Sequence, residues 1–338
     1  EVAVVFVFLV WVCLIGFNPA AYGTEKFMDY AFMQKMVTTT KLPPDDVWFA
    51  GKIINYYYGG QYYAAFVAKT MIGGISKTEY SYNMMRALIP ALMFAGVYGI
   101  ADEMIKNRAK KKNVDFYKTK NRARIQFFAV LSAVLAVFAG NGHYIVYGML
   151  KPFINNTVAS VSYTWHQDIN VDSSSYWFPD ATRYIGYNPN VPTDKTIHEF
   201  PCYSFVLGDL HAHMINIMIV ITIIALLYSF VKNLKLTEEK GKLYKCFGYP
   251  QIYALGLLWG LCNFTNYWDY IIYIVVIAIT VLFMNIMADG KIRTALKNST
   301  IHLAIVIIIG MLAALPFTMN FESVFKGVGI AQNHSKLY

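Results

Sequence analysis

Acidic residues stand four apart near the start of the chain, where apolar sequence gives way to polar sequence. Glu25 and Asp29 would share one face of a helix, and two carboxylates there suit metal binding or acid–base chemistry. The alternative is a short interfacial helix that Thr24 caps, because acidic residues are also favourable in a first helical turn. On spacing alone this structural interpretation is the favoured one.

A second cluster, Gly208-Asp209-Leu210-His211-Ala212-His213, opens a long apolar run. On a regular helix Asp209 and His213 share a face and His211 points away, so all three reach one ion only if the helix start is unwound. We predict a divalent metal site here, for Mg²⁺ or Mn²⁺. Charged groups at the mouth of a spanning helix are costly unless they are paired or functional, and a structural polar network fits equally well.

Aromatic and amide residues accompany both clusters. Asn55, Tyr56 and Tyr57 are candidates for binding a substrate; Asn55 precedes three consecutive tyrosines that start at Tyr56. The structural alternative for the tyrosines is an aromatic belt at the membrane interface. Asn266-Tyr267-Trp268-Asp269 lies between two apolar runs, where a tight hairpin turn explains it as well. Trp177, Arg183 and Glu199 lie in a long polar stretch. The sequence holds no Walker loop, nucleophile elbow or HExxH motif.

The elements that position these residues are apolar. Of 338 residues 57% are hydrophobic and 14% charged, whereas soluble domains carry about 25% charged residues. Apolar runs approach the ~20 residues that cross a bilayer, and in lipid such runs must be helical. We predict an all-α integral membrane protein, a polytopic bundle of about 7–8 helices forming a single membrane domain over 1–338, and expect the chain to be a fragment of a longer protein. The runs cover residues 2–17, 82–100, 125–149, 206–231, 252–262, 271–288 and 301–317.

The basic residues predict the orientation of this bundle. The net charge is +9, and Lys and Arg concentrate in short connections at 106–124, 232–245 and 291–297. Such loops mark the cytoplasmic side, which explains the charge without nucleic acid as a partner. The long polar loops 18–60 and 151–205 then share the non-cytoplasmic face, provided that the chain crosses once between residues 60 and 102. Residues 61–75 become a short re-entrant or interfacial helix, with Lys69 reaching water.

Taken together, these motifs resemble a known family over nearly the whole chain. Their types and order are similar to the uncharacterised bacterial and archaeal "YYY" membrane proteins, a family grouped with the GT-C-like membrane glycosyltransferases. Thr182-Arg183 and Tyr270 depart from the usual family pattern, which affects role assignments more than membership. The resemblance implies catalytic roles for Glu25, Asp29 and Glu199, and a metal site at Asp209, His211 and His213. It also implies that substrate is bound by Asn55, Tyr56, Tyr57, Trp177, Arg183, Asn266, Trp268 and Asp269.

The resemblance further implies a GT-C-like fold and a function. We predict a glycosyltransferase of the prokaryotic plasma membrane that takes sugar from a polyprenyl-phosphate donor, with membrane lipid as its surroundings. A carboxylate would deprotonate the acceptor and Arg183 would hold the phosphate. A transporter or channel is the rival class, although it would place polar residues near the bilayer midplane on broken helices. A non-catalytic assembly or sugar-binding protein is the third.

Overall fold

The computed structural model describes residues 1–70, 77–115, 118–150, 178–183, 197–234 and 247–322. These residues are mainly helical, and an isolated antiparallel bridge joins Asp45 and Ile53. The chain groups into two compact units, one of residues 1–134 and 208–322 and the other of residues 135–207 and 323–338. The prediction of an all-α membrane bundle is confirmed, because the described residues include five helices long and apolar enough to cross a membrane.

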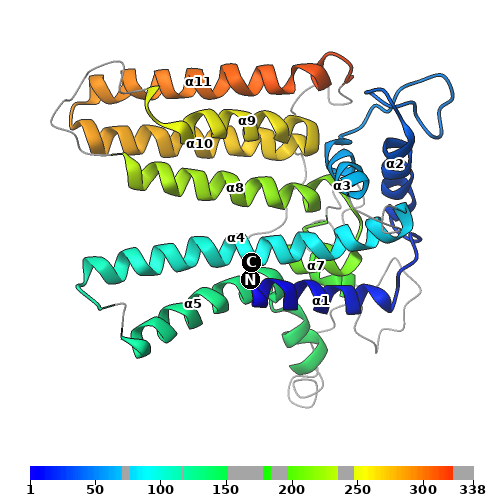
Figure 1. Ribbon diagram of the computed structural model, residues 1–338, viewed down its shortest axis with the longest axis horizontal. Coiled ribbons are helices and arrows are strands. Elements are labelled where there is room, and N and C mark those ends of the chain that lie inside the picture. The colour runs from blue at the N-terminus through cyan, green and yellow to red at the C-terminus, as the bar shows by residue number, and fades with distance from the viewer. Residues whose placement is uncertain (71–76, 116–117, 151–177, 184–196, 235–246, 323–338) are drawn as a thin grey trace, which may run out of the picture. The chain divides into compact units, whose positions relative to one another are not determined.

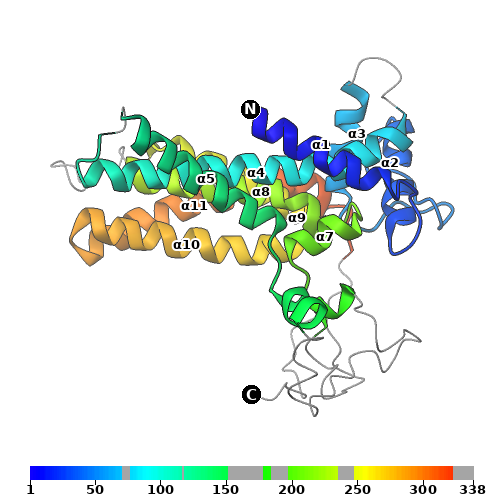
Figure 2. The same cartoon turned by 90° about the horizontal axis from the view of Figure 1, so that it is seen from below.

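The five candidate spans are α4 (Thr78–Lys111), α5 (Thr119–Phe138), α8 (Ala212–Asn233), α10 (Tyr267–Asp289) and α11 (Ile292–Thr318). The shorter apolar helix α1 (Val2–Gly16) packs along α4, and α9 (Pro250–Thr265) packs against α8, α10 and α11 (Figure 1; Figure 2). Within the described residues these seven helices agree with the predicted number.

The core of the first unit forms where α9 meets its neighbours. Ile252, Leu255 and Trp259 on α9 are almost fully buried among apolar residues of α8, α10 and α11. The Trp259 indole stacks on Tyr270 with ring centroids 4.3 Å apart, and its N–H donates to the Tyr270 carbonyl oxygen at 2.7 Å. Gly260 allows α11 to come close, since a Cβ there would lie 2.4 Å from the carbonyl oxygen of Gly310.

One end of this bundle, here the inner end, gathers the basic connections. Lys232 at the end of α8 pairs with Glu103 of α4. At the junction of α10 and α11, Asn298 donates to Asp289 at 2.9 Å, and the ring of His302 packs edge-on against Phe230 of α8. The late turns of α4, α8 and α10 therefore lie together with the first turns of α11.

The opposite end, here the outer end, carries α2 (Lys26–Thr38) and α3 (Gly59–Thr70). Gly59, at the start of α3, lies against Phe264 at the end of α9. Arg86, near the start of α4, contacts Gly208, which precedes α8. Both α3 and α4 thus begin at the outer end, and α4 alone is a candidate span between residues 60 and 102 among those described. The single crossing in this part of the chain stays a prediction.

Two boundaries differ from the sequence expectation. The polar stretch 18–60 is not a continuous loop, because it contains α2 and the start of α3. The apolar run predicts a helix from residue 206, but the helix α8 begins only at Ala212, after Gly208 with its φ of +69°. In the second unit the structure describes η2 (Tyr144–Leu150), η3 (Phe178–Thr182) and α7 (Pro201–Leu207).

Candidate functional site

Asp209 joins the turn before α2 to the segment before α8. Its Oδ1 accepts a hydrogen bond from the Thr24 hydroxyl at 2.6 Å, and its Oδ2 accepts one from the Glu25 backbone N–H at 3.4 Å. Gly23 and Thr24 both have positive φ, +80° and +50°, which turns this backbone toward the carboxylate. Asp209, which is 184 positions from Glu25 along the chain, thus accepts the hydrogen bond of the backbone N–H that precedes α2.

Glu25 and His211 contact each other at the same place, with Oε2 of Glu25 facing Nε2 of His211. The Glu25 side chain is 54% exposed and that of His211 is 23% exposed, so solutes can reach the pair. His211 occupies the cap position of α8 in an extended conformation, and its ring lies 5.4 Å from that of His213. The first polar stretch and the histidine cluster are therefore in direct contact.

The expected helical face shared by Asp209 and His213 is wrong, because α8 begins at Ala212 and Asp209 precedes it. Among the described residues no group of three or more His, Cys, Asp and Glu side chains is placed to hold a metal ion. Asp209 is engaged by Thr24 and Glu25, and His211 is engaged by Glu25. As placed, these side chains do not form the predicted Mg²⁺ or Mn²⁺ site, and use of a divalent ion stays a prediction.

Asp29 lies inside the protein and is fully buried. Its Oδ1 accepts from Gln61 Nε2 at 2.9 Å, and Gln61 also donates to the Leu210 carbonyl oxygen at 2.8 Å. Among the described residues its Oδ2 has no hydrogen-bond partner. The pKa of Asp29 is raised to about 8, mainly by burial and also by the charges of Asp209 and Glu25, while the Gln61 hydrogen bond opposes the shift. At neutral pH this carboxyl is therefore mostly protonated.

Two buried cations at this site were missed in the sequence. Lys26 is 7% exposed and Arg86 is 3% exposed. Arg86 donates to Asn83 at 2.7 Å, and its guanidinium lies so close to Gly208 that a Cβ there would be 2.4 Å from Nη2. Burial lowers the pKa of Lys26 and the charge of Arg86 lowers it further, while Asp209 opposes this. Arg86 had a usable signal, since a charge within an apolar run marks a functional candidate.

The Tyr-Tyr-Tyr-Gly-Gly-Gln segment, residues 56–61, positions α3. Tyr57 stacks on Tyr267 at 6.2 Å, with the rings within 7° of parallel, and Tyr58 packs edge-on against Phe264 at 5.0 Å. A Cβ at Gly60 would lie 2.8 Å from Ile215, so glycine permits close packing of α3 on α8. These contacts explain the motif structurally and direct Gln61 toward Asp29.

Other predicted substrate residues also have structural partners. The Asn55 side chain donates to the Glu322 carbonyl oxygen and accepts from the Glu322 N–H, both at 2.9 Å. Tyr56 lies near the acidic cluster, and its pKa is raised to about 12, mainly by burial and also by the charges of Asp29 and Glu25. Its phenol therefore stays protonated and able to donate. Substrate binding by Asn55, Tyr56 and Tyr57 stays a prediction.

The Asn266 to Asp269 segment forms the turn between α9 and α10. Asp269 accepts hydrogen bonds from Asn216 at 2.6 Å and from Asn266 at 2.8 Å. The Thr265 hydroxyl donates to Asn216 at 2.5 Å, which ties the turn to α8. Trp268 is 57% exposed, so it remains the most accessible aromatic group of this turn. The hairpin interpretation accounts for the contacts, and substrate binding here stays a prediction.

Arg183 and Glu199 belong to the second unit. Arg183 donates to the Pro179 carbonyl oxygen at 2.7 Å and lies 3.5 Å from the Tyr203 hydroxyl. Glu199 accepts from the Ser204 hydroxyl at 2.7 Å. Trp177 lies outside the described residues. Their participation in a site with Glu25 and His211 stays a prediction.

A family model matches residues 1–338 of the chain. The chain belongs to the DUF2298 family. That family is described as uncharacterized membrane proteins, so the predicted membership in such a family and the location in a membrane are confirmed. No curated protein and no solved structure matches the chain. The grouping of DUF2298 with GT-C glycosyltransferases stays a prediction.

Proposed function

We propose that the chain is a membrane glycosyltransferase whose donor is a polyprenyl-phosphate sugar, acting at the non-cytoplasmic face of a prokaryotic plasma membrane. The observation that supports this most is the contact between the Glu25 carboxylate and the His211 ring at the outer end of the bundle. This contact brings the carboxylate before α2 to the histidine before α8, and neither residue alone would form a catalytic pair. A lipid-linked donor would approach laterally from the membrane, at the level where the spanning helices end.

The Glu25–His211 pair suits general base catalysis. With the Nε2 proton of His211 donated to Glu25, Nδ1 of the imidazole keeps a lone pair that can take the proton of an acceptor hydroxyl. The carboxylate then stabilises the imidazolium that forms. Glu25 is preferred over Asp29 as the acting carboxylate, because Asp29 is fully buried and its pKa is raised to about 8.

The departing group in such a transfer is a lipid phosphate, which gains negative charge as the glycosidic bond breaks. Lys26 and Arg86 place two positive charges at the site, and Asp209 is the nearby carboxylate that moderates them. Fixed charges in a site with little water stabilise such a transition state more than they would in solution. Polar groups at helix ends favour this function over transport, which places them near the midplane.

Loss of donor tests the proposal directly. The protein purified in lipid nanodiscs is incubated with a panel of polyprenyl-phosphate sugars and a membrane extract that supplies acceptors, and the intact donor is followed by mass spectrometry. We expect protein-dependent loss of one donor, with release of polyprenyl phosphate. Glu25→Gln and His211→Ala should each slow this by about a hundredfold, the usual contribution of general base catalysis.

Glu79→Gln is the matched control, because Glu79 is an exposed carboxylate in the first turn of α4 at the same end of the bundle. It should leave the rate unchanged. Stability of every donor in the panel, or equal rates for wild type, Glu25→Gln and His211→Ala, would contradict the proposed reaction.

A further inference from the structure

A groove of about 340 Å³ lies between α4 and α8 toward the inner end, away from the site at the outer end. At Gly96 the two helices touch, since a Cβ there would lie 2.3 Å from Cγ2 of Ile221. One turn later a Cβ at Gly99 would meet no atom within 4 Å. Ala95, Gly99 and Ala225 therefore leave the floor of the groove unfilled.

The groove runs along two candidate membrane spans. From Ala95 to Glu103 the helix rises about 12 Å, so the groove reaches from the apolar part of α4 to the charged inner end. Gly99 is exposed, which leaves the floor open at the side of the bundle. At this depth the molecules available to fill an apolar opening are lipid chains rather than water.

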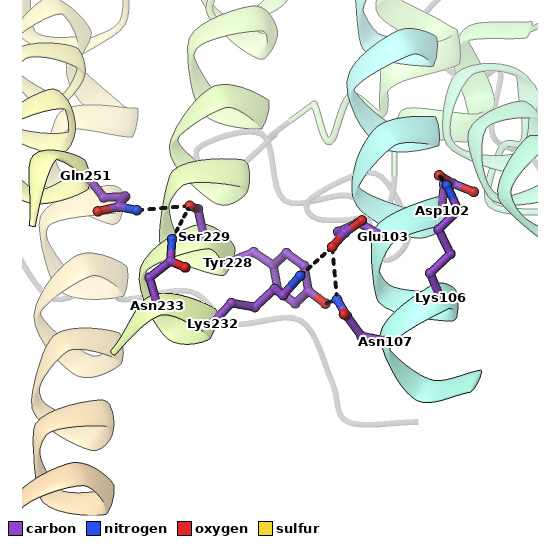
Figure 3. A network of polar contacts seen from close by, with 9 residues as sticks. All are labelled: Asp102, Glu103, Lys106, Asn107, Tyr228, Ser229, Lys232, Asn233 and Gln251. Atoms are coloured by element: carbon purple, nitrogen blue, oxygen red, sulfur yellow. Dashed lines mark hydrogen bonds and ion pairs between the residues drawn. The ribbon is translucent and has the colours of Figure 1, made fainter. Parts of the chain in front are cut away.

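Polar groups close the groove at its inner end (Figure 3). Lys232 and Asn107 both donate to Glu103, and Asn107 also donates to the Tyr228 hydroxyl at 2.7 Å. The Tyr228 hydroxyl therefore keeps its own proton for another acceptor. An ammonium has three N–H donors and Glu103 accepts one from Lys232, so this end still offers donors for phosphate oxygens.

The surrounding charge selects the kind of lipid. Arg108, Lys110 and Lys111 occupy the last turn of α4, directly beyond the groove. Clustered basic side chains at the cytoplasmic surface attract anionic headgroups. We propose that this groove binds an anionic phospholipid of the inner leaflet, with an acyl chain along Ala95 and Gly99 and the phosphate at Lys232 and Tyr228.

Native mass spectrometry of the purified full chain tests this site. The protein is mixed with equal amounts of phosphatidylglycerol and phosphatidylcholine in detergent, and retained lipids are counted as the detergent is removed. We expect wild type to retain one phosphatidylglycerol in preference. Lys232→Ala should weaken that retention about tenfold by removing a charged phosphate contact. Gly99→Leu should abolish it by filling the floor.

Matched controls separate the groove from general membrane contact. Gly16→Leu places the same side chain on α1, where a Cβ also meets nothing within 4 Å, and Lys297→Ala removes an exposed inner-end charge outside the groove. Both should retain the lipid as wild type does. Equal retention of the two lipids, unchanged retention in Lys232→Ala, or a second protein copy in place of lipid would overturn the proposal. Circular dichroism verifies that each variant is folded.

Discussion

Three carboxylates near one another at the outer end differ because their surroundings differ. Glu25 is exposed and pairs with His211, Asp209 accepts hydrogen bonds from the turn before α2, and Asp29 is buried with a raised pKa. Environments that separate the protonation of neighbouring acids are typical of sites that use both an acid and a base. In the proposed reaction Glu25 therefore takes the accessible role and Asp29 a neutral, positioning role.

Asp29→Asn should reduce the pH dependence of stability. The unfolded carboxyl ionises near its ordinary pKa of 3.8, whereas the folded pKa is about 8. Between these values the folded state holds more protons, so wild type loses stability as pH rises, by roughly 1.4 kcal/mol per pH unit at most. Asparagine keeps the oxygen that Gln61 contacts and removes the titration. Thermal unfolding in detergent from pH 4 to 9 should show a flatter profile for the variant.

Glu79→Gln is the control for this measurement, because the exposed Glu79 carboxylate should leave the slope as it is in wild type. Identical slopes for wild type and Asp29→Asn would mean that Asp29 is ionised in the folded protein, and its assignment as a neutral group would be wrong.

Sequence reasoning identified the acidic and histidine residues of the site, including the buried Asp29 and Asp209, and missed Gln61, Lys26 and Arg86. Glu25 and His211 were visible as acidic and histidine residues at the borders of apolar runs. Gln61 and Lys26 gave no such signal, because their roles depend on contacts with residues distant in the chain, such as the Leu210 carbonyl oxygen. Arg86 had the signal of a charge inside an apolar run but was not singled out.

At the scale of elements, hydrophobic runs predicted the spanning helices well and their ends less well. The run through residues 206–231 contains α8, but the positive φ of Gly208 and the packing of Arg86 on it delay the helix to Ala212. Hydropathy cannot show such a break, because Leu210 is apolar and fully buried. The helix α2 agrees with the short helix that the structural interpretation of Glu25 and Asp29 predicted, although Glu25 and not Thr24 occupies its cap position.

Gly260→Ala should destabilise the packing of α9 on α11. A methyl group there would lie 2.4 Å from the backbone oxygen of Gly310, which cannot move as a side chain can. Overpacking of this kind costs about 1–3 kcal/mol, more than the helix propensity that alanine gains over glycine. The melting temperature in detergent should fall. Gly16→Ala has open space around the added methyl and should not lower it; equal melting temperatures for both variants would contradict the close contact.

At the scale of the molecule, charge is distributed between the two ends of the first unit. Arg108, Lys110 and Lys111 in the last turn of α4 make the inner end basic, whereas at the outer end Glu25 and Asp209 lie with Lys26 and Arg86. Short connections rich in basic residues lie on the cytoplasmic side of a membrane, so this difference in charge predicts how the bundle is oriented. From this orientation we predict that the Glu25–His211 pair faces the non-cytoplasmic side.

Cysteine labelling in intact cells should show this orientation. The native Cys13, Cys202, Cys246 and Cys262 are first replaced by alanine, and single cysteines then replace Lys52 or Lys291, which are both exposed. Asp46 lies near Lys52 but is a poorer position for a cysteine, because its carboxylate accepts hydrogen bonds from the N–H groups of Trp48 and Phe49. An impermeant maleimide should label position 52 directly, and position 291 only after the membrane is permeabilised. Labelling of both positions from outside, or the reverse pattern, would place the proposed site on the wrong face for a donor in the outer leaflet.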